Sequence, residues 1–369
     1  MITYKYKKVN KTKISLYFFI KMRYNIIDKT LLRWNMTREI FGKTKSGEIV
    51  EIVTLTNEVA ELKVMTRGAT IVSFKPYGMD IVGGYDTMER YAADTGSYQG
   101  ATVGRVANRI GDAQFTMDGA IYMVTANDNG NCLHGGSGFS FKMWKIEDVT
   151  EDSVTMSYYS PDGEDGFPNG LMSKVKFTLS GAAVIIEYEA IPDGKTPIAL
   201  TNHSYFNLDG FGGLIDNHVA TIYADKYTEV DGKLIPNGIR PEVKGGAYDF
   251  TSPKKIGECF GKEVDGYDHN FILCPKFSAE FNGKDIPLAA SVTNGKLTLN
   301  VYTDQPGIQF YTGNFLGGKP DFRGGVERIK HGAFCLEAQT EPNCINHGIG
   351  FYDAGEVYTQ ITVYEVKQA

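Results

Sequence analysis

The stretch Lys174-Val175-Lys176-Phe177-Thr178-Leu179-Ser180-Gly181-Ala182-Ala183-Val184-Ile185-Ile186-Glu187-Tyr188-Glu189 decides the class of fold. Polar and apolar residues alternate in Lys174–Leu179, as they do in a strand with one face on a core. A Ser180-Gly181 turn follows, and Val184–Glu189 supplies a second strand signal. The stretch therefore predicts an antiparallel β-hairpin.

The same period of two recurs in 153–159, 296–302 and 359–364. The 42 glycines and 22 tyrosines suit many tight turns between aromatic-rich strands. Helical periodicity is scarce, and Asp86–Ala93 predicts at most a short helix. Because no internal repeat or Pro/Ser-rich linker divides the chain, we predict one all-β domain over residues 36–369, a large antiparallel β-sandwich.

Residues 1–35 differ in composition from the rest, with nine Lys or Arg against the single acidic residue Asp28. Their apolar run, Ile14–Ile20, is too short to cross a bilayer and lacks a small-residue cleavage site after it. We expect a dispensable basic extension, with a cryptic targeting signal as the alternative. Whether these residues belong to the native protein is left open by the sequence.

The net charge and the cysteine pattern indicate which partners and which cellular compartment the sequence favours. A net charge of -6 disfavours nucleic acid as a partner, and no segment predicts membrane insertion. The five cysteines show no C-x-x-C spacing, which favours a reducing, cytoplasmic location over a disulfide framework. The sequence does not choose between a monomer and a homodimer.

Three motifs contain the titratable side chains of greatest interest. His134 lies in Leu133–Gly136, His203 in Asn202–Leu208, and Glu337 in the predicted strand 333–338. A histidine and a carboxylate can move two protons near neutral pH, whereas no nucleophile motif accompanies them. The sequence indicates a general acid–base enzyme. The alternatives are a surface loop histidine, a core histidine and an edge-strand glutamate.

Other polar residues are candidates for ligand binding. Arg109, beside Asn108, is suited to donating a fork of hydrogen bonds to vicinal hydroxyls, or is a structural arginine. Asp268 is an acceptor for a ligand hydroxyl or an Asx-turn residue. Around His203, the neighbouring amide and hydroxyl side chains are expected to orient the ring, and aromatic residues to stack on a sugar; these are Asn202, Ser204 and Asn207, and Tyr205, Phe206 or Phe310.

Metal ligation has little support in the sequence. The segment 265–271 lacks the ligand spacing of a calcium loop. A zinc site from His134, His203 and His269 has no supporting metal-ligand spacing. We therefore expect no metal.

Seven motifs in order resemble the aldose 1-epimerase (galactose mutarotase) family, from about Thr37 to the C-terminus: Gly83–Tyr91, Gly104–Ile110, Leu133–Gly136, Asn202–Leu208, Tyr267–Leu273, Gly307–Asn314 and Leu336–Pro342. The resemblance implies a galactose mutarotase-like supersandwich that needs no cofactor and interconverts the α and β anomers of free aldohexoses such as galactose and glucose. The family motif more often has threonine where this chain has Ala338, a side chain expected to point away from Glu337.

The resemblance also implies roles for single residues. Glu337 would be the general base at the anomeric hydroxyl, and His203 the general acid at the ring oxygen. The positions that would bind and orient the sugar are Asn108, Arg109, His134, Asp268 and Gln309.

Two rival functions remain at this stage. A non-catalytic carbohydrate-binding protein would use the same hydroxyl-binding residues without needing His203 and Glu337. A hexose-phosphate mutarotase would want a further cation at the pocket edge, for which Arg105 is the candidate. A preference for galactose or glucose is not derivable from the residues.

Overall fold

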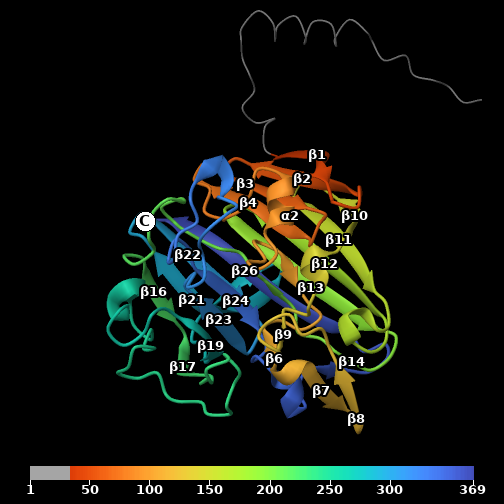
Figure 1. Cartoon of the computed structure of the whole chain (residues 1–369). Coiled ribbons are helices and arrows are strands. Elements are labelled where there is room, and N and C mark those ends of the chain that lie inside the picture. The colour runs from red at the N-terminus through yellow and green to blue at the C-terminus, as the bar shows by residue number, and fades with distance from the viewer. Residues whose placement is uncertain (1–33) are drawn as a thin grey trace, which may run out of the picture. The chain divides into compact units, whose positions relative to one another are not determined.

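The computed structural model describes residues 34–369, which form one compact unit (Figure 1). The first strand of this unit begins at Trp34. The basic extension expected over residues 1–35 lies, apart from its last two residues, outside the described part of the chain.

The largest sheet has ten strands, paired antiparallel throughout. In spatial order they are β10 (Lys145–Val149), β11 (Ser153–Ser160), β12 (Leu171–Ser180), β13 (Ala183–Pro192), β26 (Tyr358–Gln368), β22 (Leu297–Thr303), β21 (Lys284–Thr293), β16 (Val219–Ile222) and β18 (Lys254–Lys255), while β20 (Ser278–Phe281) pairs with β21.

The predicted hairpin is confirmed as β12 and β13, with Ser180 opposite Ala183. The turn is Gly181-Ala182, one residue later than expected, and Gly181 has a φ of 56°. Glycine fits this left-handed position without steric cost. Along β12 the side chains alternate between buried and exposed up to Phe177, as the period of two predicts.

Two four-stranded sheets complete the main layers. One contains β1 (Trp34–Lys43), β2 (Ile49–Asn57), β3 (Ala60–Met65) and β4 (Thr70–Pro76). The other, which we call the site sheet, contains β17 (Ala224–Tyr227), β19 (Asp268–Leu273), β23 (Gly307–Tyr311) and β24 (Cys335–Gln339).

Short strand pairs and helical turns fill the connections. The pairs are β5 (Thr102–Val103) with β15 (Thr201–Asn202), β6 (Arg109–Ile110) with β9 (Cys132–Leu133), β7 (Gln114–Met117) with β8 (Ala120–Met123), and β14 (Thr196–Pro197) with β25 (Phe351–Tyr352). The helical elements are α2 (Met88–Ala93), η2 (Gly111–Ala113), η3 (Phe139–Phe141), η4 (Glu164–Gly166), η5 (Ile256–Cys259), η6 (Arg323–Gly325) and η7 (Cys344–His347).

The helix α2 confirms the short helix expected in Asp86–Ala93, and the Thr87 hydroxyl caps it by accepting from the Arg90 N–H. Among residues 34–369, none of the helices has the length and apolar character needed to span a bilayer.

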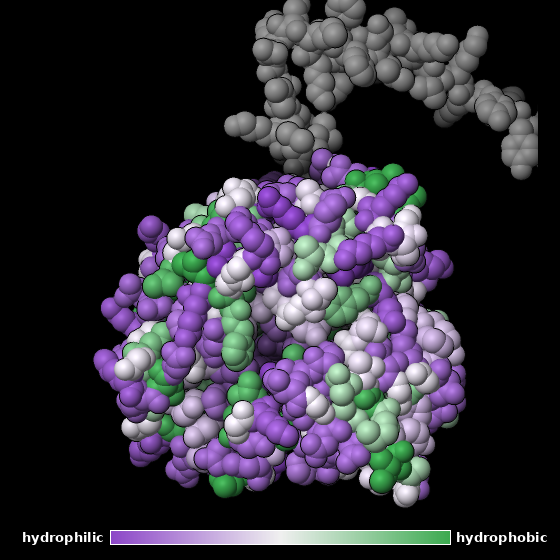
Figure 2. Space-filling view, in the orientation of Figure 1, coloured by the Kyte–Doolittle hydropathy of each residue, from purple (hydrophilic) through white to green (hydrophobic). Residues whose placement is uncertain are grey.

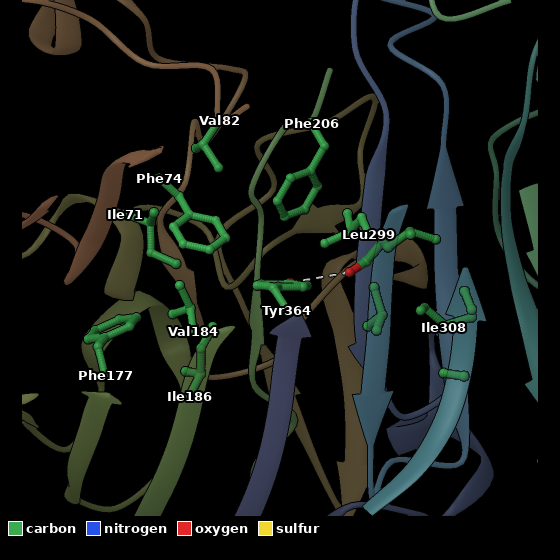
Figure 3. Packing of buried hydrophobic residues seen from close by; sticks show 14 of the residues in the cluster. Ile71, Phe74, Val82, Phe177, Val184, Ile186, Phe206, Leu299, Ile308 and Tyr364 are labelled. Carbon is green, nitrogen blue, oxygen red and sulfur yellow. Dashed lines mark hydrogen bonds between the residues drawn. The ribbon is translucent and has the colours of Figure 1, made fainter. Parts of the chain in front are cut away.

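The main core lies between the ten-stranded sheet and the two four-stranded sheets (Figure 3). Figure 3 shows Val184 and Ile186 of β13 beside Ile71 of β4. The Tyr364 hydroxyl of β26 donates to the Leu336 carbonyl of β24 at 3.3 Å. The predicted all-β sandwich is confirmed, and its core packs against one face of the site sheet.

Candidate active site

The site sheet sorts its side chains by strict alternation onto two faces. Directly opposed residues on neighbouring antiparallel strands point to the same face. The register therefore places two rows of polar and sulfur side chains on the face away from the main core: Asp268–Tyr311–Cys335 and Asn270–Gln309–Glu337.

The intervening residues point into the main core: Phe271, Ile308, Phe310 and Leu336. The expectation that Phe310 stacks on a sugar is therefore wrong, because it lies one residue after Gln309 and so faces the opposite way. Phe206 is also a core residue, packed on Phe334 and Tyr364. Tyr205 is the aromatic of this set that reaches the cavity.

His203 is held by the strand pair β5–β15. Its backbone N–H donates to the Ala101 carbonyl at 3.0 Å, and its carbonyl accepts from the Gly100 N–H at 2.9 Å. Asn202 donates to the Gly100 carbonyl and accepts from Ser204. The Asn202 amide and the Ser204 hydroxyl therefore fix the backbone around His203 and orient its ring only through that backbone.

Arg109 and His134 come from the strand pair β6–β9. The Asn108 backbone N–H donates to His134 Nδ1 at 3.1 Å, and the His134 N–H donates back to the Asn108 carbonyl at 3.0 Å. Arg109 Nε donates to Asp128 at 2.7 Å, and the hydrogen bonds found within residues 34–369 leave its two terminal nitrogens for a ligand. Gly135 follows with a φ of 73°, and a Cβ there would lie 2.3 Å from the Gly104 carbonyl oxygen. Glycine is required at this close approach.

These elements surround a cavity of about 290 Å³. Figure 2 shows a hollow in the middle of the viewed face, between the places that Figure 1 labels β24 and β9. Six of the seven residues singled out from the sequence line the cavity: Asn108, Arg109, His134, His203, Asp268 and Glu337. Gln309 stands directly behind this wall and donates to Asp268 Oδ1 at 2.7 Å.

Glu337 and His203 form the centre of the cavity. Glu337 Oε1 lies 3.7 Å from His203 Nε2, and both side chains are buried. Burial, and then the charge of Asp268, raise the pKa of Glu337 well above its usual value, while Arg109 opposes this shift. Burial lowers the pKa of His203 to about 4. The arrangement is suited to transferring a proton between the two groups through a ligand.

His134 is held as a hydrogen-bond donor. Burial, and then the nearby His203, keep the pKa of His134 well below its usual value, so the ring is neutral. Its Nδ1 accepts from the Asn108 N–H, which leaves the proton on Nε2. A neutral Nε2–H is a donor toward an oxygen in the cavity.

The same tautomer argues against a metal at this place. Ligand atoms of His134, His203 and Glu337 lie within 4.8 Å of one another. A metal at His134 Nε2 would need a lone pair there, yet the Asn108 N–H forces that lone pair onto Nδ1. His269, the third ligand of the imagined zinc site, packs against Tyr248 outside the lining of this cavity. The donor set does not fit a metal ion.

Arg105 does not supply a cation at the cavity edge. Its guanidinium is fully buried and donates to Ser160 and Thr196 and to the backbone carbonyls of Pro161 and Pro168. The residue is structural, so it gives no support to a phosphorylated hexose as substrate.

Part of the cavity wall was not foreseen from the sequence: Asp94, Ser97, Tyr98, Tyr311, Phe315 and Arg328. Arg328 donates to Tyr85 at 2.6 Å and pairs with Asp94 at 3.2 Å, which ties two loops together at this wall. Only Tyr311 carried a usable signal, because it lies two residues after Gln309 on a predicted strand and must share its face.

Comparison with known proteins identifies the family. The family model described as aldose 1-epimerase matches residues 51–365. The chain belongs to the aldose 1-epimerase family. Galactose mutarotase of Rattus norvegicus is 40% identical over 321 residues, which cover 85% of this chain and 92% of that protein. Aldose 1-epimerase of Escherichia coli (strain K12) is 34% identical over 348 residues, covering 89% and 99%.

A solved structure agrees with these relatives. The crystal structure of galactose 1-epimerase from Lactobacillus acidophilus NCFM has a TM-score of 0.80 and 25% identity, and covers 91% of this chain and 99% of its own. This aldose 1-epimerase is thus an isomerase acting on a carbohydrate, as the sequence motifs predicted.

Proposed function

We propose that this aldose 1-epimerase interconverts the α and β anomers of galactose and of glucose, with Glu337 as general base and His203 as general acid. The observation that carries the proposal is the state of Glu337. Its Oε2 is buried and has no hydrogen-bond partner among residues 34–369, while its Oε1 faces His203. A buried acceptor without a donor costs about 1–3 kcal/mol, and a sugar hydroxyl would relieve that cost.

The reaction moves one proton from His203 to Glu337 through the sugar. The Glu337 carboxylate takes the proton of the anomeric hydroxyl, and the His203 imidazolium gives its Nε2 proton to the ring oxygen. The C1–O5 bond breaks and an aldehyde forms, leaving Glu337 protonated and His203 neutral. After rotation about C1–C2, Glu337 gives its proton to the aldehyde oxygen while His203 takes the proton of the O5 hydroxyl. O5 then attacks C1, and the ring closes as the other anomer.

The electrostatics of the cavity favour the ring-opened stage. Burial raises the pKa of Glu337 and lowers that of His203, so a protonated Glu337 beside a neutral His203 is the preferred arrangement of their shared proton. This is the arrangement reached when the ring has opened. The site therefore stabilises the open-chain aldehyde, and the transition state that leads to it, relative to the closed ring.

The remaining cavity residues bind and orient the sugar in this proposal. Asp268 accepts from sugar hydroxyls and the terminal nitrogens of Arg109 donate to them, while Gln309 binds the sugar indirectly by holding Asp268 in place. The neutral His134 Nε2–H adds a donor near the ring oxygen. The names of the relatives support galactose as a substrate, and glucose differs from it only in the configuration at C4.

The test is polarimetry of freshly dissolved α-D-galactose and α-D-glucose with purified protein. The expected result is a faster approach to the same final rotation for both sugars. A rate equal to that without protein, with sugar binding still detected by calorimetry, would reject the catalytic roles and leave a sugar-binding protein.

A further inference from the structure

The back of the His203 ring faces a sulfur atom. Cys335 Sγ lies 3.6 Å from His203 Nδ1, and both residues are buried. Within residues 34–369 no carboxylate hydrogen-bonds to this nitrogen. In many enzymes the nitrogen of a catalytic histidine that faces away from the substrate donates to a carboxylate, and that negative charge favours the protonated ring.

Cys335 reaches this place because of its register on β24. It precedes Glu337 by two residues, so both side chains point to the cavity face of the site sheet. Strand β24 therefore supplies both the carboxyl group of Glu337 near Nε2 of His203 and the thiol of Cys335 near Nδ1 of the same ring.

The thiol remains protonated in this environment. Burial, and then the charges of Glu337 and Asp268, raise the pKa of Cys335 well above its usual value. A neutral thiol sulfur is a weak acceptor for the Nδ1–H. The proton cycle requires this Nδ1–H, because His203 gives up the Nε2 proton and keeps the other.

Other groups also surround the His203 ring. Burial disfavours the charged ring and outweighs the backbone of His203 itself and, after it, the charge of Asp94, which both favour the charged ring. The neighbouring rings are those of Tyr98, His134, Tyr205 and Tyr311. Glu337 is the remaining titratable group in contact, at Nε2.

We propose that Cys335 is a positioning residue, which supports His203 through a weakly accepting sulfur and so keeps the imidazolium a strong acid toward the ring oxygen. The inference rests on the proposed roles of His203 and Glu337. A stronger acceptor at this place would make His203 more basic and would hold the proton on the ring when it is needed on the sugar oxygen.

The experiment replaces Cys335 by serine and follows His203 by ¹⁵N NMR titration, together with the pH profile of kcat. The serine hydroxyl is a stronger acceptor, so in Cys335→Ser the midpoint of His203 rises by roughly half a pH unit, equivalent to less than one kcal/mol. The value of kcat falls about threefold while KM stays within about twofold, because a more basic His203 is a weaker acid.

Two further variants serve as controls for this experiment. Cys344→Ser exchanges another buried free cysteine, which packs away from the cavity, and leaves the His203 midpoint where it is in the wild type. Cys335→Ala removes the acceptor, so its midpoint stays or falls and never rises. An unchanged midpoint in Cys335→Ser, or a rise in Cys335→Ala if the serine variant does not fold, would overturn the role of Cys335. Loss of the proposed function is seen separately, as wild-type protein without activity.

Discussion

At the scale of single residues, Asp268 both binds the sugar in our proposal and sets the acidity of its neighbour. Its charge is the second cause, after burial, of the raised pKa of Glu337. In Asp268→Asn that charge is gone, so Glu337 ionises more easily and the acidic limb of the kcat/KM profile moves to lower pH. We expect KM to rise about tenfold or more, because a hydrogen bond to a charged acceptor is lost.

The pH profile of Asp268→Asn is compared with that of Asp112→Asn. Asp112 is exposed and lies outside the lining of the active-site cavity. An acidic limb of Asp268→Asn that stays in place or moves to higher pH would contradict the electrostatic coupling between Asp268 and Glu337.

The sequence motifs predicted the acid–base and sugar-binding residues of the site better than they predicted the other residues that line its cavity. Glu337 and Gln309 lie on strands, where the period of two places a side chain once its neighbour is assigned. Asp94 and Arg328 come from irregular loops far apart in the chain, and no local pattern brings them together. Phe310 has the chemistry of a stacking platform for a sugar, but its position beside Gln309 on the strand turns it into the core.

At the scale of elements, the turn after β9 sets the position of His134. In Gly135→Ala the new Cβ would lie 2.3 Å from the Gly104 carbonyl oxygen, so the turn or its neighbour must move. We expect the free energy of unfolding, measured in denaturant, to be about 1–3 kcal/mol lower than in the control variant Gly130→Ala, because the added methyl group overpacks the turn. We also expect kcat/KM to fall, because the shifted turn displaces His134.

The control for that variant is Gly130→Ala on the same segment. Gly130 also has a positive φ, of 86°, but nothing lies within 4 Å of its added Cβ. It therefore measures the backbone strain alone, about 1 kcal/mol, with kcat/KM unchanged. Equal effects of the two variants on stability and activity would show that the close approach at Gly135 has no special importance.

The hairpin of β12 and β13 and the helix α2 were predicted from sequence because their signals are local. The pairing of β13 with β26 was not predicted, since it joins residues such as Ile185 and Val363 from distant parts of the chain. Two-residue strands such as β6 and β9 are too short to show a period of two in the sequence. Each is stabilised by its pairing with the other.

At the scale of the whole molecule, the neutral histidines make stability depend on pH. Burial lowers the pKa of His203 from its ordinary value of 6.5 to about 4 in the folded chain. Between these values the unfolded chain binds a proton that the folded chain does not, so the free energy of unfolding rises with pH. One such group contributes up to about 1.4 kcal/mol per pH unit.

Replacing His203 by asparagine removes this contribution. Denaturant unfolding of wild type and His203→Asn between pH 4.5 and 6.5 is expected to show a shallower rise with pH in the variant. Glu337 acts in the opposite sense, since its raised pKa makes the folded chain bind the extra proton above pH 4.5. The difference between the two proteins isolates His203, and parallel curves would contradict its low pKa.

The central claim is that Glu337 and His203 share one proton during ring opening. The most direct measurement is kcat for α-D-galactose, by polarimetry, in Glu337→Gln, His203→Asn and the double variant, with sugar binding followed by calorimetry. We predict that each single variant loses about 10²–10⁴-fold in kcat, that the double variant is scarcely worse than either, and that binding persists. A single variant within about tenfold of wild type, or losses that multiply in the double variant, would contradict the shared-proton mechanism.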